Sequence, residues 1–314
     1  MRALGRSGAP VSSLGVGGYL GLLDDAGASD EQRVEAAVEA VRRAVDLGVR
    51  YFDTSPAYGD AERYLGRGLA ALPAGERQQL TVSTKVGTHP ERPRRYDADS
   101  VKWCFERSQE LLGRIDIVYV HDPGSDEDVD RILGAGGAFD ALEELKAQGT
   151  IRGLGLGVRN HRFLRRAVDS GRCDAILPSY DYHPLRTTVA PVLAHAAARG
   201  VGVANASPYN AGLLAGIDLD EASRRRAPQD ADLARARQLW AWCQERDLDL
   251  GVLAVQHNLR CPDIHTVLVG PRTAAEVEGC VRHATTPVPD WVWEELEIFV
   301  TKLRPPAAPG GETQ

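Results

Sequence analysis

The chain has 314 residues, with 37 Lys and Arg against 44 Asp and Glu, which gives a formal net charge of −7 at neutral pH. Hydrophobic residues make up 43% and charged residues 26%, which is typical of globular proteins and excludes a disordered or collagen-like chain. The mild acidic excess argues against a nucleic-acid-binding surface, because such a surface needs clustered Lys and Arg.

Short apolar runs alternate with longer amphipathic ones along most of the chain, as expected of repeated strand–helix units. The predicted strands are residues 14–16, 50–52, 80–84, 115–120, 153–156, 175–177, 201–204 and 266–269. Predicted helices include residues 32–47, 61–71, 100–112, 139–148, 162–170, 189–199 and 231–246. Eight such units favour an α/β fold, a (β/α)₈ TIM barrel, over a doubly wound open sheet, which shares the local pattern.

Two segments outside the repeat are predicted to be ordered. Residues 2–13 carry the turn signals of an N-terminal hairpin, and residues 290–303 predict an extra C-terminal helix. No linker divides the repeat, so residues 1–303 are interpreted as one barrel domain. Residues 304–314 are rich in Pro and Gly and are expected to form a disordered tail.

The cysteines and the absence of targeting signals indicate the cellular compartment. Five cysteines are spread widely and form no C-x-x-C pair, which indicates a reducing compartment and neither a disulfide framework nor a cysteine zinc site. No other metal cluster is predicted. The sequence shows no signal peptide and no membrane-spanning segment, so a cytoplasmic protein without membrane partners is expected.

Polar residues end three consecutive predicted strands. Asp53 ends the second, Lys85 the third and His121 the fourth, while Tyr58 lies in the loop that follows Asp53. In a barrel, neighbouring strand ends converge on the face that carries active sites. Taken singly, Asp53 could cap a turn, His121 could have a structural role, and Tyr58 could be a packing aromatic. A buried Lys85, however, needs a counter-charge, which Asp53 would supply.

These four side chains together suit acid–base chemistry on a carbonyl group. A phenol has a pKa of about 10, and a nearby ammonium lowers it, so Lys85 is predicted to lower the pKa of Tyr58. Asp53 would keep Lys85 charged, and His121 would hydrogen-bond the substrate oxygen. A tyrosine that gives and takes a proton suits carbonyl–alcohol interconversion, which also needs a nicotinamide as hydride carrier.

The segments YFDTSPAYG, STKVG and VHDP resemble the signature segments of the aldo-keto reductase superfamily. The resemblance implies a (β/α)₈ barrel in which Tyr58 is the proton donor or acceptor, Lys85 and Asp53 tune it, and His121 orients the carbonyl. The stretches IDIVYVHDP, IRGLGLGVRN and GVGVANASPYNAGLL are similar to the branch of L-fucose, D-threo-aldose and L-galactose dehydrogenases and pyridoxal 4-dehydrogenase. Members of that branch oxidise an aldose at C1 to a lactone, or a related hemiacetal, with NAD or NADP.

The resemblance also suggests where the nucleotide binds. Asn160 matches the family residue that hydrogen-bonds the carboxamide, and Ser207 follows the seventh strand. The backbone around Gly270 and Thr273, at a predicted helix start, could cradle a phosphate, and Arg272 is the candidate for a 2′-phosphate. Because the Glu276 carboxylate would repel that phosphate, the choice between NADP and NAD stays open.

Four positions depart from the family pattern. Ala206 stands where many members have a nicotinamide-stacking Tyr, and Arg159 stands where Ser is usual. Gly279 and Cys280 replace a frequent Glu-Asn pair that contacts adenine. These departures predict a changed nucleotide site.

Tyrosines close to the predicted strand ends suggest a pocket for a small carbonyl or sugar substrate. Tyr19, Tyr180 and Tyr209 offer flat faces with hydroxyls, which suit a sugar or a polar ring. Aldose oxidation is the preferred interpretation. The alternatives are carbonyl reduction in a specialised biosynthetic pathway and a non-catalytic, cofactor-binding regulatory barrel; the oligomeric state stays open.

Overall fold

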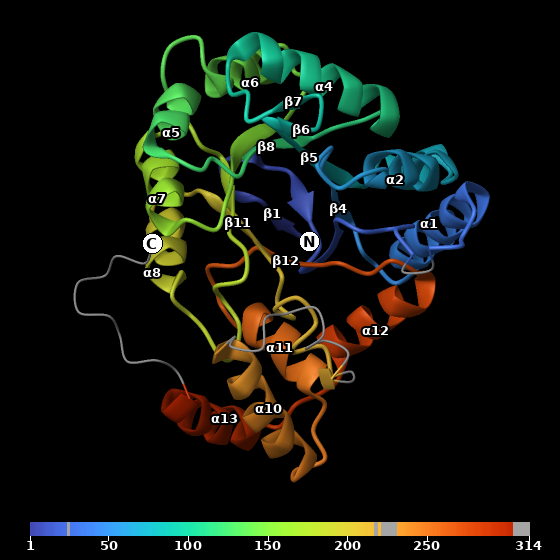
Figure 1. Cartoon of the computed structure of the whole chain (residues 1–314), viewed down its shortest axis with the longest axis vertical. Coiled ribbons are helices and arrows are strands. Elements are labelled where there is room, and N and C mark those ends of the chain that lie inside the picture. The colour runs from blue at the N-terminus through green and yellow to red at the C-terminus, as the bar shows by residue number, and fades with distance from the viewer. Residues whose placement is uncertain (24–25, 217–218, 221–230, 304–314) are drawn as a thin grey trace.

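The computed structural model describes residues 1–23, 26–216, 219–220 and 231–303, so the tail predicted at residues 304–314 lies outside the described part. Eight parallel strands close into a barrel in the order β10-β11-β12-β3-β4-β5-β8-β9, which confirms the predicted (β/α)₈ fold (Figure 1). The barrel strands are β3 (Leu14–Gly17), β4 (Tyr51–Asp53), β5 (Thr81–Val86), β8 (Ile117–His121), β9 (Gly153–Gly157), β10 (Ala175–Leu177), β11 (Gly202–Ala206) and β12 (Thr266–Val269).

Helices surround the barrel, and each predicted helix has a counterpart within a few residues. A capping box begins the first of them: the Ser29 side chain accepts from Gln32 N–H, and Gln32 reaches back to the Ser29 backbone. The helices are α1 (Asp30–Asp46), α2 (Ala61–Ala70), α3 (Ala74–Arg77), α4 (Ala98–Leu112), α5 (Asp126–Leu133), α6 (Ala138–Ala147), α7 (His161–Asp169), α8 (Ala190–Ala197), α10 (Ala231–Gln244), α11 (Leu250–Leu259), α12 (Ala274–Thr285) and α13 (Asp290–Leu303).

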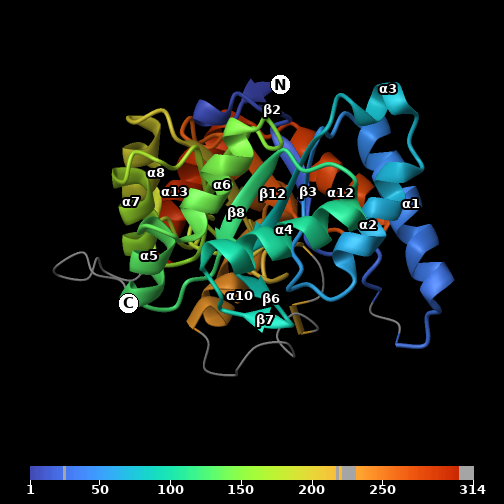
Figure 2. The same ribbon diagram turned by 90° about the horizontal axis from the view of Figure 1, so that it is seen from above.

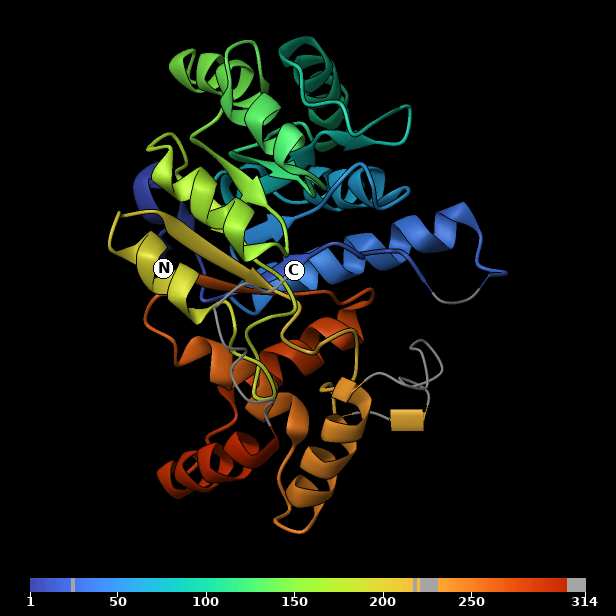
Figure 3. The ribbon, with the colours of Figure 1, turned by 60° about the vertical axis from the view of Figure 1, so that its left-hand side comes forward.

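Both predicted additions to the barrel are present. The N-terminal hairpin pairs β1 (Arg2–Ala3) with β2 (Pro10–Val11) around a short 3₁₀ helix, η1 (Gly5–Ser7). Helix α13 lies beside α10 at one side of the molecule, seen in orange and red at the bottom of Figure 3, and the two share an apolar cluster. A further hairpin, β6 (Thr88–His89) with β7 (Arg92–Pro93), follows β5 and was not predicted.

The two hairpins lie at opposite ends of the barrel (Figure 2). The N-terminal hairpin covers the end where the strands begin, and its Leu4 is fully buried against the barrel interior. A Cβ on Gly202 would come within 2.7 Å of the Leu4 carbonyl carbon, so this closure needs a glycine. The carboxyl ends of the strands therefore stay open on the side of β6 and β7.

The glycines of β9 allow close packing inside the barrel. A Cβ on Gly155 would lie 1.9 Å from the backbone oxygen of Ala175, whereas one on Gly157 would have its nearest neighbours at 3.6 Å. We expect Gly155→Ala to lower the free energy of unfolding by about 1–3 kcal/mol, because overpacking moves backbone. Gly157→Ala is the matched control, and thermal melting of both variants tests the difference. Equal melting temperatures would show that β10 yields freely at Ala175.

None of the helices in the described part of the chain combines the length and the apolar character needed to cross a membrane. All five cysteines are buried and free. Within the described ranges, no group of three His, Cys, Asp or Glu side chains is arranged to hold a metal ion.

Candidate active site

The structure brings together Asp53, Lys85 and His121 at the carboxyl ends of the adjacent strands β4, β5 and β8. Lys85 Nζ lies 2.5 Å from Asp53 Oδ2 and donates to the Thr54 carbonyl oxygen at 2.8 Å. The Lys85 side chain is 2% exposed and that of Asp53 is 6% exposed. Burial alone lowers the pKa of Lys85, but Asp53 and Tyr58 raise it above its ordinary value, so the lysine stays an ammonium.

A second layer of polar side chains supports this ion pair from inside the barrel. Ser83 Oγ donates to Asp53 Oδ1 at 2.6 Å and lies 2.8 Å from Tyr51 OH, which lies 3.2 Å from Tyr119 OH. Burial raises the pKa of both tyrosines above the ordinary range, so they stay neutral. Because both Asp53 oxygens have donors, the carboxylate is fixed in one orientation.

Tyr58 lies beside the ion pair, in the loop after β4. Its ring centroid is 5.1 Å from Lys85 Nζ and 5.8 Å from the His121 ring, and Tyr19 stacks on it at 5.5 Å. The prediction of a lowered pKa is wrong for the protein without ligands: burial raises the pKa of Tyr58 more than the Lys85 ammonium lowers it. Tyr58 is therefore a protonated phenol at neutral pH.

His121 is neutral and held by its neighbours. Burial, followed by the charge of Lys85, lowers the pKa of His121 to about 3. Its Nδ1 lies 2.8 Å from Thr88 Oγ1, and its Nε2 lies 3.3 Å from Asp122 Oδ2. Since a carboxylate only accepts hydrogen bonds, the proton of the neutral imidazole lies on Nε2, and Thr88 donates to Nδ1.

A cavity of about 850 Å³ extends from these four side chains to the first turns of α12. Most of the predicted binding residues line it: Tyr19, Tyr180, Tyr209, Ser207, Gly270 and Arg272. Asn160 and Thr273 are not among the lining residues. Asn160 Oδ1 accepts from the Arg162 and Phe163 amides at the start of α7, and Thr273 Oγ1 accepts from the Glu276 amide at the start of α12.

Three of the four positions that depart from the family pattern lie in the wall of the cavity. Ala206, Gly279 and Cys280 all line the cavity, so the wall carries small side chains at these three positions. Close to them, Tyr209 OH lies 2.8 Å from His283 Nδ1, and His283 Nε2 lies 3.6 Å from Asp249 Oδ2. This Tyr–His–Asp contact was not predicted, because its members are far apart in the chain.

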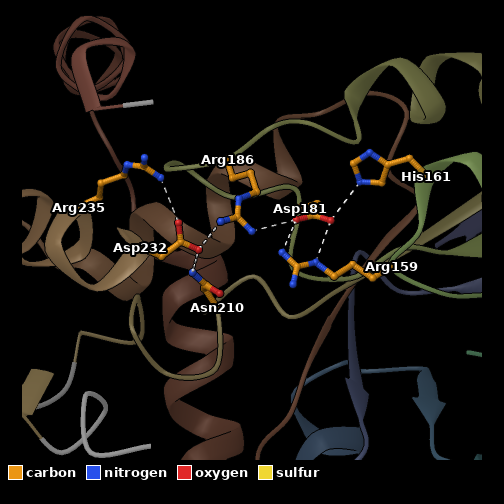
Figure 4. A network of polar contacts seen from close by, with 7 residues as sticks. All are labelled: Arg159, His161, Asp181, Arg186, Asn210, Asp232 and Arg235. Carbon is orange, nitrogen blue, oxygen red and sulfur yellow. Dashed lines mark hydrogen bonds and ion pairs between the residues drawn. The ribbon is translucent and has the colours of Figure 1, made fainter. Parts of the chain in front are cut away.

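Arg159, the other departure, belongs to a charged network that joins the segments after β9, β10 and β11 to α10 (Figure 4). It contacts both oxygens of Asp181, at 3.1 and 3.0 Å. Burial raises the pKa of Asp181, but hydrogen bonds from His161 and Arg159 outweigh it and hold that pKa below its ordinary value. Asp181 follows Tyr180, whose φ is 64°, so the network fixes the backbone that turns Tyr180 toward the cavity. The full network is Arg159, His161, Asp181, Arg186, Asn210, Asp232 and Arg235.

Two neighbours of the reacting groups were not predicted as site residues. Asp122 lines the cavity directly after His121, and Ser83 orients Asp53. Both had a signal in the sequence. Asp122 is the next residue in VHDP, and Ser83 precedes Lys85 by two residues, so the two side chains face the same side of β5.

The structure is a closed parallel barrel whose open end carries a buried acid–amine pair, a phenol and an imidazole. This combination defines a barrel enzyme that acts on carbonyl groups. A model of the aldo/keto reductase family matches residues 14–300. The chain belongs to the aldo/keto reductase family. It is therefore an oxidoreductase, and the hydride carrier of this family is NADP or NAD.

Similar proteins are known from bacteria and plants. The chain is 32% identical to pyridoxal 4-dehydrogenase of Microbacterium luteolum, over 94% of this chain and 96% of that protein. It is 33% identical to D-threo-aldose 1-dehydrogenase of a Pseudomonas species, over 94% and 95%, and 33% identical to L-galactose dehydrogenase of Arabidopsis thaliana, over 91% and 88%. A crystal structure from Pseudomonas aeruginosa described as an aldo-keto reductase superposes with a TM-score of 0.62 at 25% identity, covering 90% of this chain and 93% of that one.

The cavity fits a dinucleotide. One end opens on Tyr58 and His121, and the other reaches the start of α12, where helix N–H groups favour phosphate. Gly270 also lines the cavity, and it allows Tyr19 to pack closely, because a Cβ on Gly270 would come within 3.1 Å of the Tyr19 ring.

Proposed function

We propose that this enzyme oxidises a cyclic aldose at C1 to a lactone, with Tyr58 as the acid–base residue. The observation that carries the proposal is the cluster of Tyr58, Lys85, Asp53 and His121 at one end of the cavity. The names of the relatives, two of them aldose or galactose dehydrogenases, support a sugar-like substrate. We also propose that residues 1–303 act as a single barrel domain.

Each of the four residues has a distinct part in the proposed reaction. His121 Nε2–H donates to the oxygen on C1 and holds the sugar in place. Tyr58 takes the proton from that hydroxyl during oxidation, and gives it back in the reverse direction. Lys85 lowers the energy of the Tyr58 phenolate, and Asp53 keeps Lys85 charged and fixed.

The nicotinamide nucleotide, when bound, supplies the hydride acceptor. We assign Ser207, Gly270 and Arg272 to its binding from the cavity lining, and Thr273 indirectly through its cap on α12. Asn160 remains a candidate by its place in the sequence, with its side-chain oxygen engaged in capping α7. Glu276, whose carboxylate accepts from the Arg272 amide at 2.7 Å, disfavours a 2′-phosphate at this helix start.

Carbonyl reduction is the second candidate function, and one observation favours it. Tyr58 is protonated at neutral pH, which is the state that donates a proton to a carbonyl oxygen. Reduction would therefore run without prior deprotonation, whereas oxidation needs the phenolate.

Oxidation is expected to accelerate steeply with pH. Because the pKa of Tyr58 is raised above its ordinary value, the phenolate fraction grows about tenfold per pH unit through the neutral range. Reduction uses the phenol and is expected to stay flat until alkaline pH. Nucleotide reduction is followed by absorbance with L-fucose, L-galactose, D-arabinose and pyridoxal, with NAD and NADP tested separately, from mildly acidic to alkaline pH.

A rate with one of these substrates that rises with pH would support aldose oxidation. A pH-independent oxidation rate, with chemistry as the slow step, would contradict Tyr58 as its base. No oxidation with any sugar, combined with reduction of simple aldehydes, would favour the second candidate. Nucleotide binding without turnover in either direction would leave a cofactor-binding barrel.

A further inference from the structure

Asp122 is a charged side chain that reaches the reacting end of the cavity and has no part in the proposed proton transfer. It lines the cavity, and its Oδ2 lies 3.3 Å from His121 Nε2, the atom that the proposed function assigns to the substrate oxygen. Its side chain is 62% exposed, so a ligand entering the cavity meets it.

The backbone holds Asp122 in an uncommon conformation. Its φ is 44°, in the left-handed region that few residues other than glycine adopt. The backbone is held by two contacts: the Asp122 amide donates to the Gly157 carbonyl oxygen at 2.9 Å, and the Tyr96 hydroxyl lies 2.9 Å from the His121 carbonyl oxygen and 3.1 Å from that of Asp122. Pro123 follows and limits the chain further. The carboxylate is therefore presented to the cavity by a fixed frame.

The position of this carboxylate suits a substrate that carries a hydroxyl beside the reacting carbon. A substrate oxygen that accepts from His121 Nε2 replaces Asp122 as the partner of that N–H group. The carboxylate, which lies 3.3 Å from that nitrogen, is then available to accept from a hydroxyl on the carbon next to the reacting one.

We propose that Asp122 is a specificity residue that selects substrates with a hydroxyl vicinal to the reacting carbon and disfavours plain aldehydes and alcohols. This inference rests on the proposed function for the identity of the reacting end, and it extends that function to the class of substrate. A plain aldehyde offers the Asp122 carboxylate no hydrogen-bond donor, whereas an α-hydroxy aldehyde does, so the enzyme gains binding energy only with the hydroxylated substrate. Burial raises the pKa of Asp122 above its ordinary value, and the charges of Lys85 and Arg94 oppose this only in part.

The test compares glyceraldehyde with propanal in the reducing direction, using NADH and NADPH. The two aldehydes have the same carbon chain and differ in hydroxyls. In the wild-type enzyme we expect kcat/KM to favour glyceraldehyde. Asp122→Ala is expected to lower kcat/KM for glyceraldehyde about tenfold or more, mostly through KM, and to leave or raise that for propanal. Asp122→Asn keeps an acceptor oxygen, so its kcat/KM for glyceraldehyde is expected to lie between those of the wild-type enzyme and Asp122→Ala.

Glu127→Gln is the matched control, because it removes an exposed carboxylate from the first turn of α5. It is expected to keep the wild-type preference. A loss of the same factor for both aldehydes in Asp122→Ala would overturn the inference, since it would show that Asp122 acts only through His121. Failure of the wild-type enzyme to reduce glyceraldehyde would overturn it as well.

The outcome is separate from that of the sugar assays. A preference for glyceraldehyde that Asp122→Ala abolishes, without oxidation of any sugar, would support Asp122 and contradict aldose oxidation. If the enzyme oxidises a sugar, but Asp122→Ala keeps the preference for glyceraldehyde, aldose oxidation would be supported and the proposed role of Asp122 contradicted.

Discussion

Tyr58→Phe is expected to lower kcat by about a thousandfold in both directions while the nucleotide still binds. The substitution removes only the phenolic oxygen, which we assign to the proton transfer, and general acid–base catalysis contributes 10²–10⁴-fold to a rate. The ring stays, and with it the stacking on Tyr19 at 5.5 Å and the contact with His121. Steady-state rates, with nucleotide affinity measured by fluorescence quenching, test the expectation.

Tyr64→Phe is the control, because it deletes a hydroxyl on α2 that bonds Asp30 outside the cavity. It is expected to retain wild-type rates. An unchanged rate in Tyr58→Phe would exclude the tyrosine as acid or base. A loss of nucleotide affinity as large as the loss of rate would assign Tyr58 to binding.

The barrel could be predicted because its information is local. Each strand is a short apolar run between helical stretches, and Thr266–Val269 and Ala175–Leu177 begin and end at the predicted residues. The hairpin of β6 and β7 was missed, since its two-residue strands carry Pro93 and show no apolar alternation. Strands of two residues are too short to show a hydrophobic pattern in the sequence.

The convergence of the predicted site residues was also predictable, because strand order in this barrel follows chain order. Asp53, Lys85 and His121 end consecutive strands, so closure of the barrel alone brings them together. The alternation of side chains extends this: Tyr51, Ser83 and Tyr119 each precede one of the three by two residues and form the layer below. The pattern YFD, STK, YVH therefore contains both layers.

Charge states and loop contacts were not predictable to the same extent. The sequence shows that Lys85 can approach Tyr58, but the pKa of Tyr58 depends on how much of the phenol is buried, and burial outweighs the ammonium. Likewise, the contact of Arg159 with Asp181 depends on loops after two different strands. Such balances are set by tertiary packing, which residue spacing does not reveal.

Lys85→Met is expected to destabilise the protein and to abolish most activity. It leaves the Asp53 carboxylate buried without its cation, and breaking a buried ion pair costs about 3–5 kcal/mol of unfolding free energy. It also removes the charge that stabilises the Tyr58 phenolate. Denaturant unfolding and steady-state kinetics, measured on the same preparation, test both effects.

The double variant Asp53→Asn with Lys85→Met separates the two roles of the pair. With both charges removed, no uncompensated ion remains in the barrel, and Asn at position 53 can still accept from Ser83 Oγ. We therefore expect most of the lost stability to return, while activity stays as low as in Lys85→Met. Recovery of activity along with stability would mean that the pair only maintains the fold around Tyr58. Recovery of stability alone would show that the ammonium acts on the phenol, and that the barrel tolerates its charge for the sake of the reaction.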